Sequence, residues 1–162
     1  MKRTLIASIT LLFASCGVSY QYTGTIKQES RLIDSTGFKN DLVKIQFQPL
    51  KDRISFGLVN SSPDPISILW DNTTIAINGK TQPVTHGGVV IRDRMKEQRP
   101  STVPPGMQFN DYLIPSNNIY YVSGDLGGGY VEDLFKPGSR VDLNLAINAK
   151  DSIKYLYFTF EP

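Results

Sequence analysis

Three stretches of this chain alternate apolar and polar or small side chains with a period of two residues. Residues 43–47 and 54–58 each carry three apolar side chains in alternate positions, and residues 141–147 extend the same pattern over seven positions. Successive side chains of a β-strand point to opposite faces, so this period predicts strands with one buried face. A shift of one residue would move every apolar side chain of such a strand into water, so the pattern also fixes the register.

Turn residues separate these stretches from others of similar length. Residues 60–65 form a turn cluster with two prolines, and Asn78 and Gly79 lie between two β-prone segments, which is typical of a hairpin. Eight or more short strands with turns between them predict an all-β fold, an antiparallel β-sandwich. Further strands are expected at 66–70, 74–77, 81–86, 107–114 and 118–122, with a break or bulge at Gly87 and Gly88 before 89–91, and only residues 92–101 are compatible with a helical turn.

The last strand, residues 153–160, has apolar side chains on both faces. Leu156, Phe158 and Phe160 occupy one face, and Ile153 with two tyrosines occupies the other. Strands buried on both faces have such continuous apolar runs. We therefore expect this strand to be central and covered on both sides, or its tyrosine side to lie under a loop.

The amino end has the three parts of a secretory signal. Lys2 and Arg3 precede an apolar run from residue 5 to residue 14, and small residues follow. The apolar run has about ten residues, whereas a membrane-spanning helix needs about 20. The sequence Phe13-Ala14-Ser15-Cys16 resembles the lipobox of bacterial lipoproteins, with phenylalanine in place of the usual leucine.

The lipobox resemblance implies that Cys16 is the site of lipid attachment. In that family a diacylglycerol is joined to the cysteine sulfur, the signal is cut just before it, and the new amino end is often acylated. Two or three chains suffice for stable anchoring. Cys16 is the only cysteine, so no intramolecular disulfide can form, and an ordinary signal peptide that contains a cysteine is the alternative.

The same resemblance implies the location and the division of the chain. Gly17 follows the cysteine, and in enterobacterial lipoproteins the lack of Asp at this position favours the outer membrane over the inner membrane. We expect a lipoprotein signal peptide at 1–15, a lipidated amino end and tether at 16–40 with a possible edge strand, and a β-sandwich domain at 41–162.

Three short motifs resemble bacterial immunoglobulin-like domains. A strand at 56–60 ends in Asn60, Pro65 and Ile66 open the next strand, and residues 103–106 form a Pro-Gly corner before another. The resemblance covers about residues 41 to 160 and implies an immunoglobulin-like sandwich without the Cys-Trp-Cys core. The whole chain resembles small bacterial lipoproteins of unknown function, which supply no active site to carry over.

Composition limits the possible partners. Lys2 and Arg3 account for the excess of basic residues, so the chain from Cys16 onward has 15 basic and 15 acidic residues. A nucleic-acid-binding protein needs a clustered positive face, so no nucleic-acid partner is expected. His86 is the only histidine, no Gly-x-Ser-x-Gly elbow accompanies it, and a zinc site needs three or four ligands, so a structural or surface role is favoured for it over a catalytic or metal-binding one. We expect no catalytic residues, no metal and no cofactor.

The function expected from these observations is a non-enzymatic binding or accessory role in the bacterial envelope. The chain would be anchored through Cys16 and would contact an envelope protein or a glycan. A core position for Trp70, a structural role for His86 and a solvated loop at 92–99 are alternatives. The expected contact surface consists of Trp70, Asp71, His86, Arg92, Arg94, Lys96 and Arg99.

Two other functions remain open. One is an envelope hydrolase, because glycosidases need only two carboxyl groups, and Asp71 with Asp111 or Asp125 would supply them. The other is a phage- or plasmid-borne lipoprotein that blocks a surface receptor. The sequence does not separate this third function from the first.

Overall fold

The computed structural model describes residues 25–27, 37–122 and 128–161. Short 3₁₀ helices, η1 (Trp70–Asn72), η2 (Ile91–Asp93) and η3 (Ser116–Asn118), interrupt a chain of strands. The strands are β1 (Thr25–Lys27), β2 (Gly37–Lys39), β3 (Val43–Pro49), β4 (Ile54–Asn60), β5 (Ile66–Ile68), β6 (Thr74–Ile77), β7 (Lys80–His86), β8 (Ser101–Val103), β9 (Gln108–Pro115), β10 (Ile119–Val122), β11 (Gly128–Val131), β12 (Val141–Ala149) and β13 (Ser152–Glu161).

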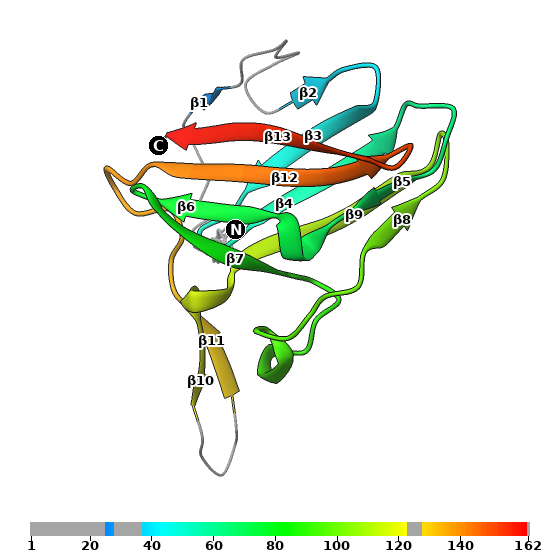
Figure 1. Ribbon diagram of the computed structural model, residues 1–162. Coiled ribbons are helices and arrows are strands. Elements are labelled where there is room, and N and C mark those ends of the chain that lie inside the picture. Colours follow the sequence, from blue (N-terminus) through cyan, green and yellow to red (C-terminus); the bar gives the residue numbers. More distant parts are fainter. Residues whose placement is uncertain (1–24, 28–36, 123–127, 162) are drawn as a thin grey trace, which may run out of the picture.

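The strands form two packed layers, with β10 and β11 as a separate two-stranded sheet (Figure 1). One layer has the order β1-β13-β12-β6, and β5 joins it by pairing with both β12 and β8. The other layer has the order β9-β4-β3-β2. Every pairing is antiparallel. The all-β antiparallel fold predicted from the sequence is confirmed.

Strand β7 belongs to both layers. Its first half pairs with β6, from Lys80 opposite Ile77 to Pro83 opposite Thr74. Its second half pairs with β9, where Val84 lies opposite Pro115 and His86 lies opposite Leu113. The strand thus leaves one layer and enters the other without a loop, which is how corners form in β-sandwiches.

The core lies between the layers and is rich in phenylalanine. Phe47 of β3 meets Phe158 and Phe160 of β13 edge to face, with ring centroids 4.6 and 5.5 Å apart. Phe38 of β2 packs edge to face against Phe158 at 5.5 Å. Such aromatic pairs contribute about 0.5–1.5 kcal/mol each beyond the area that they bury. Strand β2 is therefore part of the sandwich, although it lies in the segment expected to act as a tether.

Asn60 connects three segments at one end of the sandwich. Its fully buried side chain donates hydrogen bonds to the carbonyl oxygens of Asp64 and Val103, at 2.8 and 2.9 Å. Its Oδ1 accepts hydrogen bonds from the backbone N–H and the hydroxyl of Ser62. The end of β4, the turn that leads to β5 and the end of β8 are thereby joined, and these are the motifs on which the immunoglobulin-like resemblance rests.

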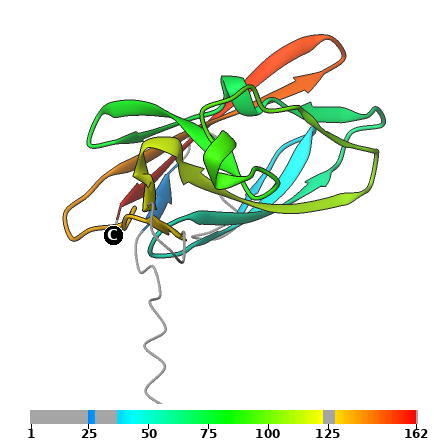
Figure 2. The same ribbon diagram turned by 90° about the horizontal axis from the view of Figure 1, so that it is seen from below.

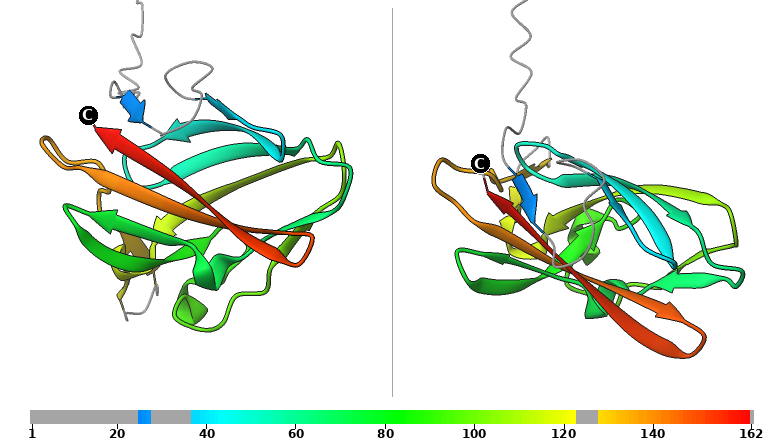
Figure 3. Two further views of the ribbon diagram at one scale, coloured as in Figure 1. Left: turned by 45° about the horizontal axis from the view of Figure 1, so that its top comes forward. Right: turned by 90° about the horizontal axis from the view of Figure 1, so that it is seen from above.

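The expectation for the last strand is wrong for the face that carries the tyrosines. Ile153, Tyr155 and Tyr157 are 43–61 % exposed, while Leu156, Phe158 and Phe160 of the other face are buried. The reason is that one face of β13 packs on the core, whereas the tyrosines lie on the outer face of the layer, which is exposed. On the side away from β12, and within the described residues, β13 pairs only with the three residues of β1 (Figure 3). The strand lies near the end of its layer and is not central.

Two local expectations also differ from the structure. The strand expected at 66–70 ends at Ile68, and the chain turns into η1 at Trp70. After Gly88 the chain does not resume a strand: a turn leads to η2, and Val90 is exposed. Glycine has no side chain that favours the extended strand conformation, and β7 ends at these two glycines. Of the two expectations for this position, a break and a bulge, the structure has the break.

Candidate functional site

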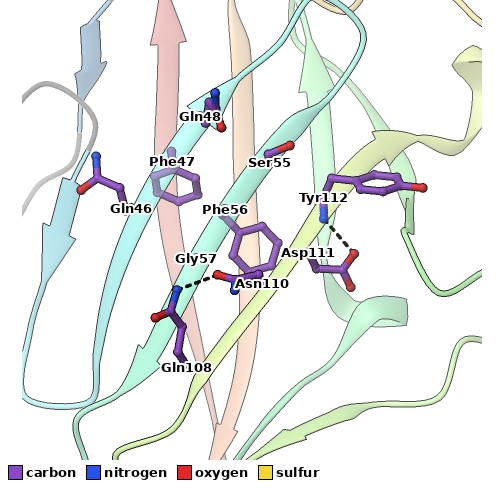
Figure 4. A pocket seen from close by; sticks show the side chains of 10 residues that line it. All are labelled: Gln46, Phe47, Gln48, Ser55, Phe56, Gly57, Gln108, Asn110, Asp111 and Tyr112. Carbon is purple, nitrogen blue, oxygen red and sulfur yellow. Dashed lines mark hydrogen bonds between the residues drawn. The ribbon is translucent and has the colours of Figure 1, made fainter.

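An open hollow of about 540 Å³ lies on the outer face of β3, β4 and β9 (Figure 4). This volume is in the usual range for small-ligand sites. Side chains of the outward-facing positions of the three strands form most of its walls. The lining residues are Gln46, Phe47, Gln48, Ser55, Phe56, Gly57, Gln108, Asn110, Asp111 and Tyr112.

Gly57 forms the centre of the hollow. It pairs with Gln46 on one side and with Asn110 on the other, so a side chain here would stand between the two walls. A Cβ at this position would lie 2.9 Å from Oδ1 of Asn110 and 3.4 Å from Nε2 of Gln108. The lack of a side chain at Gly57 therefore opens the space between β3 and β9.

The walls carry amide groups. Gln46, Gln48, Gln108 and Asn110 are exposed, and each amide offers two N–H donors and a carbonyl acceptor. Nε2 of Gln108 donates a hydrogen bond to Oδ1 of Asn110 at 2.8 Å, which orders that wall. Ser55 adds a hydroxyl group. Such a surface matches ligands with many neutral hydroxyl or amide groups.

Among the residues that the structure describes, Asp111 is the only carboxylate that lines the hollow, and its oxygens already have partners. Oδ1 accepts hydrogen bonds from the backbone N–H groups of Gly87 and Tyr112, both at 2.8 Å. Oδ2 lies 2.9 Å from Nδ1 of His86. The carboxylate therefore ties the end of β7 to β9 and supports the wall at Tyr112.

His86 and Trp70 form a stacked pair behind this wall. Their rings lie 4.4 Å apart at an angle of 12°, and Nε1 of Trp70 donates a hydrogen bond to the hydroxyl of Ser101 at 3.0 Å. Trp70 is 1 % exposed and His86 is partly buried. Trp70 is thus a core residue at the start of η1, and the ring of His86 stacks on it.

Asp71 joins the same region through the loop after η2. It accepts a hydrogen bond from the backbone N–H of Gln98 at 3.1 Å. The buried amide of Gln98 donates to the carbonyl oxygen of Val84 at 2.6 Å and accepts from the N–H of His86 at 3.3 Å. Gln98 therefore satisfies the backbone of β7 where that strand changes layers.

Tyr112 is held at the edge of the hollow by a cation. The guanidinium carbon of Arg53 lies 4.8 Å from the centre of the Tyr112 ring. Arg53 also donates hydrogen bonds to both carboxylate oxygens of Asp52, and these bonds lower the pKa of Asp52 from 3.8. The Asp52 carboxylate thus fixes the guanidinium beside the ring.

The four basic residues of the expected contact surface lie on the loop that contains η2. Side chains of Arg92 and Lys96 are 80 % and 73 % exposed, and Asp93 between them pairs with Lys96 at 2.8 Å. Arg94 is partly buried, and Arg99 is exposed. The structure thus joins Trp70, Asp71 and His86 into one network and leaves most of the basic residues on a separate surface.

The sequence analysis did not single out the amides of the hollow. The signal was present, because Gln46 and Gln48 stand at the polar positions of an alternating strand and Gln108 with Asn110 follows in another. What it lacked was the order of the strands, which brings β3 and β9 to either side of β4.

The remaining expectations concern the membrane and metals. Cys16 and Asp125 lie outside the described residues. In the part of the chain that the structure describes, no helix has the length and apolar character to cross a membrane. The same part contains no group of three or more His, Cys, Asp or Glu side chains arranged to hold a metal ion.

Comparisons with protein-family models, with curated proteins and with solved structures find no match for this chain. The function must therefore be argued from the site.

Proposed function

We propose that this chain is a lipid-anchored protein of the bacterial envelope that binds a neutral glycan in the hollow of β3, β4 and β9. The anchor rests on the lipobox at residues 13–16. The choice of ligand rests on one observation: within the described part of the chain, the walls of the hollow carry four amide side chains, and the one carboxylate there, Asp111, already has partners. Sugar hydroxyl groups both donate and accept hydrogen bonds, as amides do.

The rest of the lining favours a sugar over a charged ligand or a peptide. Tyr112 adds a phenol hydroxyl and an aromatic edge to the lining, and the Arg53 guanidinium over its ring holds it in place. Extended peptides bind mainly by adding to the edge of a sheet, whereas this hollow lies on a face, over the middle of a layer. The engaged oxygens of Asp111 support binding without hydrolysis.

The test for the ligand uses Gly57→Val. The new side chain would fill the centre of the hollow, and the atoms that it meets are ends of flexible side chains, which can move. Valine also favours strands where glycine does not, so the free energy of unfolding is expected to stay the same or rise. The matched control is Ala76→Val, which adds a similar bulk to the outer face of the other layer, at a second hollow.

The measurement is calorimetric titration with chito-, cello- and malto-oligosaccharides and with soluble peptidoglycan fragments. We expect at least one of these to bind the parent and the Ala76→Val variant, and binding by Gly57→Val to fall at least tenfold. Equal binding by Gly57→Val, or no binding of any probe by the parent, would contradict the proposed ligand.

The anchor is tested separately by mass spectrometry of protein from a bacterial membrane fraction. Cys16 is expected to carry a lipid mass, and Cys16→Ser is expected to lose both that mass and its association with the membrane. An unmodified mature chain in the periplasm would refute the anchor and leave the glycan site to be judged on its own test.

A further inference from the structure

Exposed apolar side chains are concentrated at one place on the molecule. Ten large apolar side chains are exposed in the described residues, and six of them lie on β10, β11 and the segment around η2. We call this group the hairpin surface. It consists of Val90, Ile91, Met95, Tyr120, Tyr121 and Tyr130.

The β10–β11 hairpin is not part of either layer. Among the described residues its two strands pair only with each other, and Figure 1 shows them extending away from the sandwich below β7. An isolated two-stranded hairpin is at best marginally stable in water. Exposed aromatic residues on such an element are therefore costly unless they meet another surface.

Both faces of the hairpin carry apolar groups. Tyr120 and Tyr130 lie opposite each other and stack on one face, with ring centroids 5.0 Å apart. On the other face Tyr121 lies opposite Gly129. The side chain of Ile91 covers Gly129, because a Cβ there would lie 2.9 Å from Cδ1 of Ile91.

This contact joins the hairpin to the basic loop. Strand β10 contacts η2, and Figure 2 shows the two elements side by side from below. Arg92 and Lys96, whose side chains are 80 % and 73 % exposed, directly follow Ile91 and Met95 in the sequence. Their long side chains can reach past apolar neighbours toward a charged layer.

We propose that the hairpin surface docks onto the headgroup layer of an anionic membrane, with Arg92 and Lys96 meeting lipid phosphates. Tyrosine prefers the membrane–water interface, and basic residues beside inserted apolar groups add attraction to anionic lipids. A headgroup layer suits this surface because exposed apolar side chains stand next to exposed cations in it, Ile91 beside Arg92 and Met95 beside Lys96. The inference is independent of the proposed anchor and ligand.

The chain supplies a matched pair of methionines for the test. Met95 belongs to the hairpin surface and is 64 % exposed; Met107 lies between β8 and β9, outside that surface, and is 57 % exposed. In the full chain with Cys16→Ser, a single cysteine is placed at one of these positions as Met95→Cys or Met107→Cys. Each is labelled with an environment-sensitive fluorophore and mixed with vesicles of phosphatidylcholine alone or with 30 % phosphatidylglycerol.

If the hairpin surface docks, the fluorescence emission of the label at position 95 is expected to shift to shorter wavelength on the anionic vesicles. The emission of the label at position 107 is expected to stay the same. Changing Arg92 and Lys96 to Gln is expected to weaken binding about fivefold for each cation removed. High salt is expected to weaken it as well, because exposed charges are screened.

Any of three results would overturn the inference. The first is a label at position 95 that does not respond to anionic vesicles. The second is an equal response of both labels. The third is unchanged binding after Arg92→Gln and Lys96→Gln. Equal responses would mean that the chain adsorbs without a preferred surface. No response at position 95 would leave a protein partner as the occupant of the hairpin surface.

Discussion

Asn60→Ala tests the junction at the end of β4 most directly. The substitution removes four hydrogen bonds, two donated to carbonyl oxygens and two accepted from Ser62. The bond to Val103 is fully buried, so its carbonyl oxygen loses a partner that water cannot replace, at about 1–3 kcal/mol. The other three are partly accessible and contribute about 0.5 kcal/mol each, the lower end of the usual range.

These contributions predict a loss of about 3 kcal/mol in the free energy of unfolding and a fall of about 10 °C in Tm. Urea denaturation followed by tryptophan fluorescence measures the free energy of unfolding, because Trp70 lies in the core and becomes exposed when the protein unfolds. The matched control is Asn110→Ala at an exposed position, where a change within about 0.5 kcal/mol is expected. If the two variants lost the same stability, or if Asn60→Ala lost less than about 1 kcal/mol, the junction would not hold these segments together as argued.

Two further variants test other contacts. Gln98→Ala leaves the carbonyl oxygen of Val84 and the N–H of His86 without partners, so we expect a loss of about 2–4 kcal/mol by urea denaturation, against little change for exposed Gln48→Ala. Equal losses would contradict the role of Gln98. Asp52→Asn tests the hydrogen bonds from Arg53 that lower the pKa of Asp52. A lowered pKa in the folded protein stabilises it at pH values above 3.8, and the contribution disappears as the pH falls through the folded pKa. The variant is therefore expected to be less stable than the parent at pH 7 and equally stable once Asp52 is protonated. A stability difference that does not change with pH would refute this.

The strands whose apolar side chains alternate were the most predictable part of the fold. Strands β3, β4 and β12 bury the alternate positions that the pattern assigned, because one face of each lies on the core. The hairpin at Asn78 and Gly79 was equally clear, since both residues have the positive φ that its turn requires.

Long-range order could not be predicted in the same way. Nothing local in residues 153–160 distinguishes a strand with two buried faces from one with an exposed tyrosine face; the neighbours of β13 decide it. The hollow depends on β9 pairing with β4 across more than 40 residues of sequence. The network of Trp70, His86 and Asp111 likewise combines side chains from η1, β7 and β9, so the sequence analysis named all three residues without their contacts to one another.

The dual pairing of β7 has a mechanical consequence. In many sandwiches only loops connect the layers, so the layers can shift relative to each other when side chains repack. Here the backbone of one strand is hydrogen-bonded to β6 in one layer and to β9 in the other. A load applied to β9, which forms one wall of the hollow, is therefore transmitted to β6 through main-chain bonds. The domain should therefore resist shear between its layers more strongly than a sandwich joined by loops alone.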